Sequence, residues 1–376
     1  MGKERNSNFE LMRITSMLLI ILCHIINFGG LYTNCSNPAL KVIFEILMFM
    51  TLVHVNSFVM VSGYFQSKSK FKLSKLIKMI FQVIFYSSII FFVAYKIGWI
   101  KDINVVTILN NFIPSAISNY WFINVYIIMY LFSDYINMFI DRLSHDEYKK
   151  MLIMCFIILS LVPYITGLKI LHSTGSSFFN FIYLYMIGAY LRRYPLKESY
   201  HFKVFSLNGY RLFMILIFFL SFFGNYLFNN FAMQIGGFSN SFAEISTRIL
   251  ATKFLYSTPF VIIQTIAYFE LFNTLELKNK FINLISISTF GVYLFHENTI
   301  IREHLYDILH LTYKYIISYA GMGWVLCGVF IIFMFGTIIE WIRIFFEKVI
   351  LKIPLTKKII LKLKKYLRSF NYRINI

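Results

Sequence analysis

Repeated apolar runs of about 20 residues constrain this sequence more than any other feature, because a helix of that length crosses the roughly 30 Å hydrocarbon core of a bilayer. Of the 376 residues, 58% are hydrophobic and only 14% are charged, whereas a soluble domain is about a quarter charged. Inside a bilayer, helices can satisfy all of their backbone hydrogen bonds within one segment. The sequence therefore predicts an all-α, polytopic integral membrane protein.

About ten transmembrane helices are expected from the hydropathy pattern. They cover residues 9–29, 42–65, 77–97, 120–140, 151–171, 178–193, 211–231, 249–272, 284–300 and 320–346. The first run is too long for the apolar core of a signal peptide and has no A-x-A cleavage site, so we interpret it as a retained span. The loops are short and no internal repeat is evident. We therefore expect one transmembrane domain over residues 1–350.

The basic residues predict how the chain lies in the membrane. If the N-terminus is cytoplasmic, 28 of the 36 lysine and arginine residues fall in cytoplasmic segments, as the positive-inside rule requires. Both termini are then cytoplasmic, in a multi-pass protein of the cell membrane. The net charge of +19 is a topology signal, and we expect membrane lipids rather than nucleic acid as its partner. The tail, residues 351–376, is predicted to be a basic amphipathic helix on the anionic inner leaflet, with binding to a protein partner as the alternative.

The cysteine spacing does not indicate a disulfide framework, and the absence of nucleotide-binding motifs argues against a nucleotide-driven pump. The four cysteines have no C-x-x-C spacing and no pattern typical of a disulfide framework. The sequence contains neither G-x-x-x-x-G-K-[ST] nor G-x-G-x-x-G, so nothing indicates a nucleotide-driven pump. We expect no metal site and no permanently bound cofactor.

The first span carries Arg13 and His24, and ionisable residues are expensive at membrane depth. Eleven residues turn a helix by about 1,100°, close to three full turns, so both side chains lie on one face. The rise between them is about 16 Å. Glu10 and Asn27 fall near the same stripe. Arg13 alone could extend to the headgroups and His24 could hydrogen-bond to a neighbouring helix, but their shared face favours a polar ladder toward the bundle interior.

Further polar residues occur in and beside the second span. His54, Asn56 and Ser62 lie within it, Glu45 lies near its outer end, and Gly63 permits close helix packing. A lysine-rich segment follows, including Lys72, Lys75 and Lys78. Lys75 and Lys78 are three residues apart and share a helix face. These lysines either anchor the span or bind a phosphorylated cytoplasmic ligand.

The fourth and ninth spans also carry polar groups near their outer ends. Trp121 fits an aromatic belt at the membrane interface, but Asn124 does not. His296, Glu297 and Asn298 are consecutive, and we expect them near the outer surface. They are either the end of a loop or an outer pocket with acid–base capacity.

Four sequence blocks, taken together, resemble the acyltransferase-3 family of membrane acyltransferases. The spacing of Arg13 and His24 matches the family's R-x10-H signature, and "NSFVMVSGYF" resembles its second-span motif. "YWFINVYIIMYLFSDYIN" and "STFGVYLFHEN" resemble its later motifs. These blocks extend from the first predicted span to the ninth. The family's R-x-x-R pair, implicated in donor binding, corresponds here to Lys75-x-x-Lys78, which keeps the charge but loses the bidentate fork of arginine.

The resemblance implies an O-acyltransferase that moves an acyl group, acetyl above all, from cytoplasmic acetyl-CoA to a hydroxyl of an exported or cell-surface polysaccharide. Taken with the geometry, it suggests the following roles: Arg13 and His24 in catalysis; Arg13, Lys72, Lys75, Lys78, Ser62 and Gly63 in donor binding; Glu45, Asn56, Trp121, Asn124, His296, Glu297 and Asn298 on the acceptor side. The histidine either deprotonates the acceptor hydroxyl or carries the acyl group itself. A polysaccharide flippase or secondary transporter, and a polysaccharide polymerase, remain as alternatives.

Overall fold

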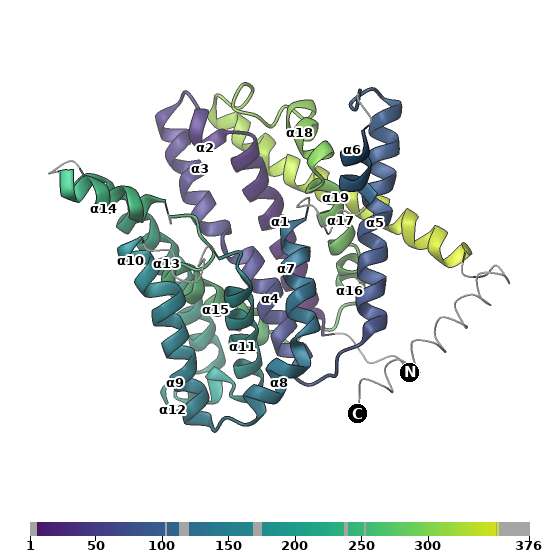
Figure 1. Ribbon diagram of the computed structural model, residues 1–376. Coiled ribbons are helices and arrows are strands. Elements are labelled where there is room, and N and C mark those ends of the chain that lie inside the picture. Colours follow the sequence, from purple (N-terminus) through teal and green to yellow (C-terminus); the bar gives the residue numbers. More distant parts are fainter. Residues whose placement is uncertain are drawn as a thin grey trace.

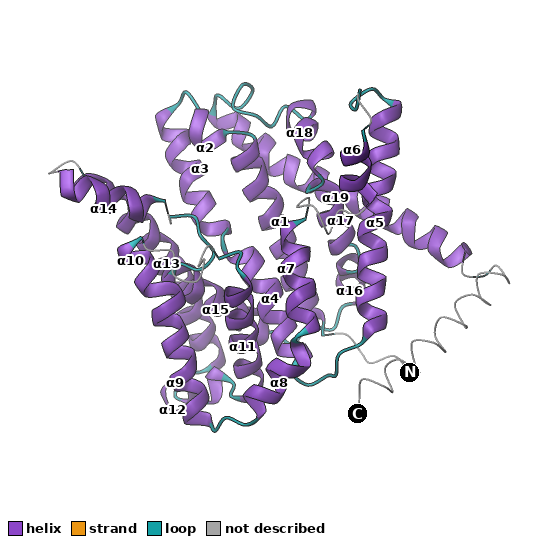
Figure 2. Ribbon diagram, in the orientation of Figure 1, coloured by secondary structure: helices purple, strands orange, loops and turns teal. Residues whose placement is uncertain are grey.

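The fold is described from a computed structural model for residues 6–101, 104–112, 120–167, 175–236, 240–251, 253–350 and 352. Within these ranges every regular element is a helix (Figure 2). The predicted all-α class is confirmed. Apart from Lys352, the predicted amphipathic tail at 351–376 lies outside the described residues.

Six helices are long and apolar enough to cross a membrane by length and composition. They are α1 (Ser7–Phe28), α3 with α4 (Pro38–Thr51 and Val53–Gln66), α5 (Leu73–Lys96), α9 with α10 (His145–Phe156 and Val162–Thr166, joined by a π-helical turn at Ile157–Leu161), α13 (Leu207–Ile235) and α19 (Tyr319–Ile350). α7 (Trp121–Leu131) and α8 (Ser133–Asp141) form a seventh candidate, bent by 52°. Seven of the ten predicted spans correspond to these helices.

The other three predicted spans are short or broken. α11 (Phe178–Arg193) has the predicted bounds but only 16 residues. The eighth span, expected as one helix over 249–272, is interrupted: α14 (Asn240–Leu250) ends, and α15 (Pro259–Asn273) begins after Thr258. The Thr258 side chain accepts a hydrogen bond from the Val261 N–H, and a proline follows it at the first helical position, a combination that starts a new helix.

The expected ninth span is also not one helix. It is divided among α16 (Lys280–Ser286), α17 (Thr289–His296) and α18 (Thr299–Ile308). Asn298 breaks it by capping α18, since its side chain accepts a hydrogen bond from the Ile300 N–H. Short helices complete the fold: α2 (Leu31–Asn34), α6 (Val105–Phe112), α12 (Tyr200–Lys203) and a 3₁₀ turn at Leu196–Glu198.

The first helix occupies the centre of the bundle (Figure 1). α3, α4, α15, α16, α17 and α19 all pack against it, and most of its side chains are buried. α4 and α11 approach each other closely because each presents a glycine. A Cβ on Gly63 would collide with the backbone oxygen of Tyr185, and one on Gly188 would collide with that of Met60. This is the small-residue packing typical of membrane helices.

Candidate active site

One face of α1 lines a cavity that runs along the inside of the bundle. Glu10, Arg13, Met17, Ile20 and His24 all contribute to its wall, at the three- and four-residue spacing of a single helix stripe. The cavity has a volume of about 390 Å³, and we call it the central cavity. Arg13 and His24 therefore do share one face, and both face the same enclosed space.

Two further cavities adjoin the central cavity, one at each end. The Arg13 cavity, of about 190 Å³, shares four lining residues with it: Arg13, Ser62, Met79 and Tyr126. The Arg302 cavity, of about 400 Å³, shares four others: His24, Trp121, Tyr256 and Glu297. Three adjoining cavities, which share wall residues, thus follow α1 from its Arg13 end to its His24 end.

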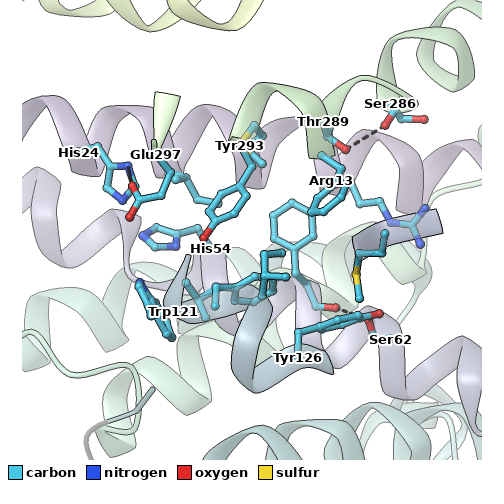
Figure 3. Close-up of a pocket in the computed structure, with 18 of the residues that line it drawn as sticks. Arg13, His24, His54, Ser62, Trp121, Tyr126, Ser286, Thr289, Tyr293 and Glu297 are labelled. Atoms are coloured by element: carbon cyan, nitrogen blue, oxygen red, sulfur yellow. Dashed lines mark hydrogen bonds and ion pairs between the residues drawn. The ribbon is translucent and has the colours of Figure 1, made fainter. Parts of the chain in front are cut away.

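The His24 end holds a histidine–glutamate–arginine series, of which Figure 3 shows His24 and Glu297. Nδ1 of His24 lies 3.1 Å from Oε2 of Glu297, and Nη1 of Arg302 lies 3.0 Å from Oε1 of the same carboxylate. The first pair is at contact distance without the alignment of a hydrogen bond, as catalytic pairs often are before substrate binds. Because Nδ1 faces the carboxylate, Nε2 is the ring nitrogen left for a substrate.

His296, Glu297 and Asn298, which the sequence left open as a loop end or an outer pocket, lie in the interior of the protein. All three are buried, with exposed fractions of 0%, 3% and 0%, because the break between α17 and α18 lies inside the bundle. His296 donates from Nδ1 to the carbonyl of Val292, at 2.7 Å, and its ring centroid lies 5.3 Å from that of His24. Of the three, Glu297 lines the central and Arg302 cavities.

Glu45 and Asn56 hold the segment between α14 and α15 against the bundle. The carboxylate of Glu45 forms an ion pair with the ammonium group of Lys253, at 2.9 Å. Asn56, which is buried, donates to the backbone oxygen of Tyr256, at 2.8 Å. Neither side chain is among the described residues that line the three cavities. Their contacts instead place the Tyr256 ring at the junction of the central and Arg302 cavities.

The two predicted residues of α7 differ in position. Trp121 lines the central and Arg302 cavities and stacks on Tyr256, with ring centroids 6.0 Å apart and an interplanar angle of 13°. Asn124 is not among the described residues that line these cavities, and its buried Oδ1 has no hydrogen-bond partner within the described chain. Trp121 is therefore in the site, and Asn124 is not among the described residues of its wall.

The basic end of the site is more open. Arg13 donates from Nη1 to both carboxylate oxygens of Glu10, at 2.9 Å each, and its side chain is 33% exposed. Lys75 lines the Arg13 cavity, as does Ser62, whose hydroxyl lies 3.1 Å from that of Tyr126. Arg13 and Lys75 thus give this end two cationic groups.

The other predicted donor-side residues lie away from these cavities. Lys78 is 69% exposed and faces Glu347 of α19, at 3.7 Å. Lys72 is tied to Tyr130 through its backbone. The Lys72 N–H donates to the Tyr130 hydroxyl, at 3.1 Å, and that hydroxyl donates to the Lys72 carbonyl. Gly63 packs against α11. Of the adjacent lysines, Lys75 is the one directed toward Arg13.

Four residues of the site were not assigned from the sequence: His54, Tyr256, Tyr293 and Arg302. His54 is an in-span histidine, so the rule that ionisable residues at membrane depth are functional would have found it. Arg302 lies just past the predicted end of the ninth span. Among the described residues, no group of three or more histidine, cysteine, aspartate or glutamate side chains is placed to hold a metal ion.

This arrangement suits proton transfer at a buried centre. A neutral imidazole oriented by a carboxylate can take a proton from a hydroxyl through its free nitrogen. Glu297 in turn is balanced by Arg302, whose guanidinium lies 4.3 Å from the centre of the Phe28 ring. The site therefore combines an imidazole whose chemistry suits a general base or a nucleophile with cavities on two sides of it.

Comparison with known proteins identifies the family. The model of the acyltransferase-3 family, described as an acyltransferase domain, matches residues 6–345. No curated protein and no solved structure matches significantly. The family match favours the acyltransferase over the transporter and the polymerase that the sequence left open.

Proposed function

We propose that this chain, which belongs to the acyltransferase-3 family of membrane acyltransferases, moves an acetyl group from cytoplasmic acetyl-CoA to a hydroxyl of an exported or cell-surface polysaccharide. One observation carries the proposal: three adjoining cavities with shared wall residues extend from a basic end to a buried His24–Glu297 pair. Such a route lets a donor and an acceptor reach one histidine from opposite sides. We take the basic end to be the cytoplasmic one, because the positive-inside pattern of the sequence favours that orientation.

The donor enters from the Arg13 end. Arg13 and Lys75 supply positive charge for the phosphates of CoA, since charge-assisted contacts to phosphate are the strong ones. Arg13 meets Glu10 through one terminal nitrogen, so the guanidinium keeps other donors for a ligand. The pantetheine arm then extends through the central cavity. The rise of about 16 Å from Arg13 to His24 brings the thioester toward the histidine.

The acceptor enters through the Arg302 cavity. Aromatic side chains contribute much of its wall: Phe28, Tyr32, Trp121, Phe254 and Tyr256. Aromatic rings with a polar edge suit a sugar, which has an apolar ring face and polar hydroxyls. Glu45 and Asn56 act on this side indirectly, because they hold the segment that carries Tyr256.

The reaction takes place where the two cavities meet. His24 either removes the proton of the acceptor hydroxyl as it attacks the thioester, or accepts the acyl group and passes it on. Glu297 orients the imidazole through Nδ1 in both cases. Burial keeps bulk water away from the thioester, which limits its wasteful hydrolysis.

The test is acyl transfer by the purified protein in lipid nanodiscs. Acetyl-CoA labelled in the acetyl group is supplied together with de-O-acetylated cell-surface polysaccharide, and label in the polysaccharide is measured. We expect transfer by the wild-type protein and none by His24→Gln. The proposal is contradicted if the wild-type protein binds labelled acetyl-CoA but neither transfers nor cleaves the acetyl group. It is also contradicted if His24→Gln transfers acetyl at the wild-type rate.

A further inference from the structure

Besides His24 and Glu297, which face each other, two residues in the wall of the central cavity carry polar groups with no hydrogen-bond partner within the described residues. Both ring nitrogens of His54 are unpaired, and so is the hydroxyl of Tyr293. Both residues line the cavity, although only 1% of His54 and 7% of Tyr293 is exposed. Buried polar groups are nearly always paired in native structures, so two unpaired groups in one cavity wall indicate a missing ligand.

The two groups come from different helices and point into the same part of the cavity. His54 is in the first turn of α4 and Tyr293 is in α17. Figure 3 shows the Tyr293 hydroxyl and the His54 ring beside Glu297 and His24. Neutral histidine and tyrosine can each donate one hydrogen bond. Together they form a pair of donors close to the proposed reacting histidine.

We propose that Tyr293 and His54 are catalytic residues that donate hydrogen bonds to the carbonyl oxygen of the acyl thioester. This inference rests on the proposed function and adds the group that stabilises the developing negative charge. Fixed donors aimed at such an oxygen are worth most in a site that excludes water. The same site then holds a base on one side of the thioester and an oxyanion hole on the other.

The step balances as follows. The acceptor oxygen bonds to the carbonyl carbon, its proton passes to Nε2 of His24, and the carbonyl electron pair moves onto the oxygen held by Tyr293 and His54. When the carbonyl re-forms, the carbon–sulfur bond breaks and the CoA thiolate takes the proton from His24. If His24 attacks the thioester itself, the charge develops on the same oxygen, so the roles of Tyr293 and His54 do not change.

Tyr293→Phe is the sharpest test because it removes one oxygen atom and keeps the ring. With acetyl-CoA and de-O-acetylated polysaccharide as probes, we expect kcat to fall by about 10²–10³-fold, the effect of losing one oxyanion donor. The KM for acetyl-CoA should stay near the wild-type value, since the contact strengthens only in the transition state. Tyr306→Phe is the matched control: Tyr306 is also buried with an unpaired hydroxyl, but it is not among the residues lining the three cavities. The kcat of Tyr306→Phe should equal that of the wild-type protein.

His54 gives a second, independent measurement. His54→Gln keeps an N–H donor and should retain more activity than His54→Leu, which has none. A base or a packing residue predicts other patterns: a base would lose as much activity in the glutamine variant as in the leucine variant, and a packing residue would lower the melting temperature along with the activity. If His54→Leu does not fold, Tyr293→Phe decides alone.

The outcomes separate this inference from the proposed function. If the wild-type protein transfers acetyl and both Tyr293→Phe and His54→Leu do so at the same rate, the oxyanion assignment is wrong and the proposed acyltransferase activity stands. Wild-type protein that transfers no acetyl at all would overturn both.

Discussion

The two ends of the central cavity lie on the same face of α1 but are built differently. At the Arg13 end, the ion-pair partner is Glu10 on the same helix, and the arginine side chain is 33% exposed. At the His24 end, the partner Glu297 comes from the break between α17 and α18, and the two side chains are 14% and 4% exposed. The first ion pair forms within one helix, and the second only through the packing of separate helices.

This difference matches what each end is proposed to do. Binding of a phosphorylated donor needs positive charge that water can reach, and exposed charges act weakly and are screened by salt. Chemistry needs groups that are held in place and shielded from water before the substrate arrives. Substitutions at the buried end should therefore affect turnover strongly, while those at the open end should affect donor affinity modestly.

The largest effect is expected for His24→Gln. Glutamine keeps a hydrogen-bonding side chain but cannot accept a proton, so turnover should fall by about 10²-fold or more. Donor affinity should persist, because the groups proposed to bind the phosphates of CoA are at the other end. Acyl transfer by the purified variant and calorimetric binding of CoA would measure the two quantities.

A structural role for His24 predicts the opposite pattern. Glutamine would then be tolerated, alanine would lower the melting temperature, and activity would follow the amount of folded protein. Near-normal turnover of His24→Gln per folded molecule would remove the contrast between the two ends.

A smaller loss is expected for Glu297→Gln. The amide keeps the shape of the carboxylate but not its charge, so it orients the His24 imidazole less strongly and no longer balances Arg302. We expect kcat to fall by about tenfold, or ~1.4 kcal/mol of barrier, with little change in the KM for acetyl-CoA. Steady-state kinetics at several donor concentrations would show this division. If donor affinity fell as much as turnover, Glu297 would belong to the donor end.

At the open end, Arg13→Gln and Lys75→Gln should each raise the KM for acetyl-CoA by about fivefold, or ~1 kcal/mol for an exposed charge pair. The increase should shrink at high salt, and kcat should change less. Lys78→Gln is the matched control, since Lys78 lies on the same helix but is directed toward Glu347. An equal effect of Lys78→Gln would mean that the lysines act through general charge and not through the Arg13 cavity.

The smallest effect on activity is expected for Gly63→Ala. A methyl group there meets the backbone of Tyr185, and overpacking of this kind costs about 1–3 kcal/mol of stability. The melting temperature in detergent should therefore fall, while the KM for acetyl-CoA of the folded fraction should not change. An altered donor KM at unchanged stability would place Gly63 at the donor end, where the sequence had put it.

Local patterns in the sequence determined the all-helical class, most of the membrane-crossing helices and the shared face of Arg13 and His24. These properties depend on hydropathy over about 20 residues and on the fixed rotation of a helix per residue, so neighbours along the chain are sufficient to define them. The bounds of α11 follow for the same reason. The two breaks had local signals: a capping threonine and a proline at Pro259, and a capping asparagine at Asn298. The apolar residues on both sides nevertheless extended the predicted spans across them.

Tertiary packing alone decided which polar residues form the site. Glu297 and Arg302 lie more than 270 positions after His24 in the chain, and the sequence left open whether Glu297 ends a loop or lines a pocket. The break between α17 and α18 turns its carboxylate toward His24. Likewise, Lys75 and Lys78 are equivalent by spacing, and only the neighbouring helices assign one to Arg13 and the other to Glu347. Helix periodicity sets the direction in which a side chain points. Which residue it contacts depends on where the other helices lie, and no local pattern encodes those positions.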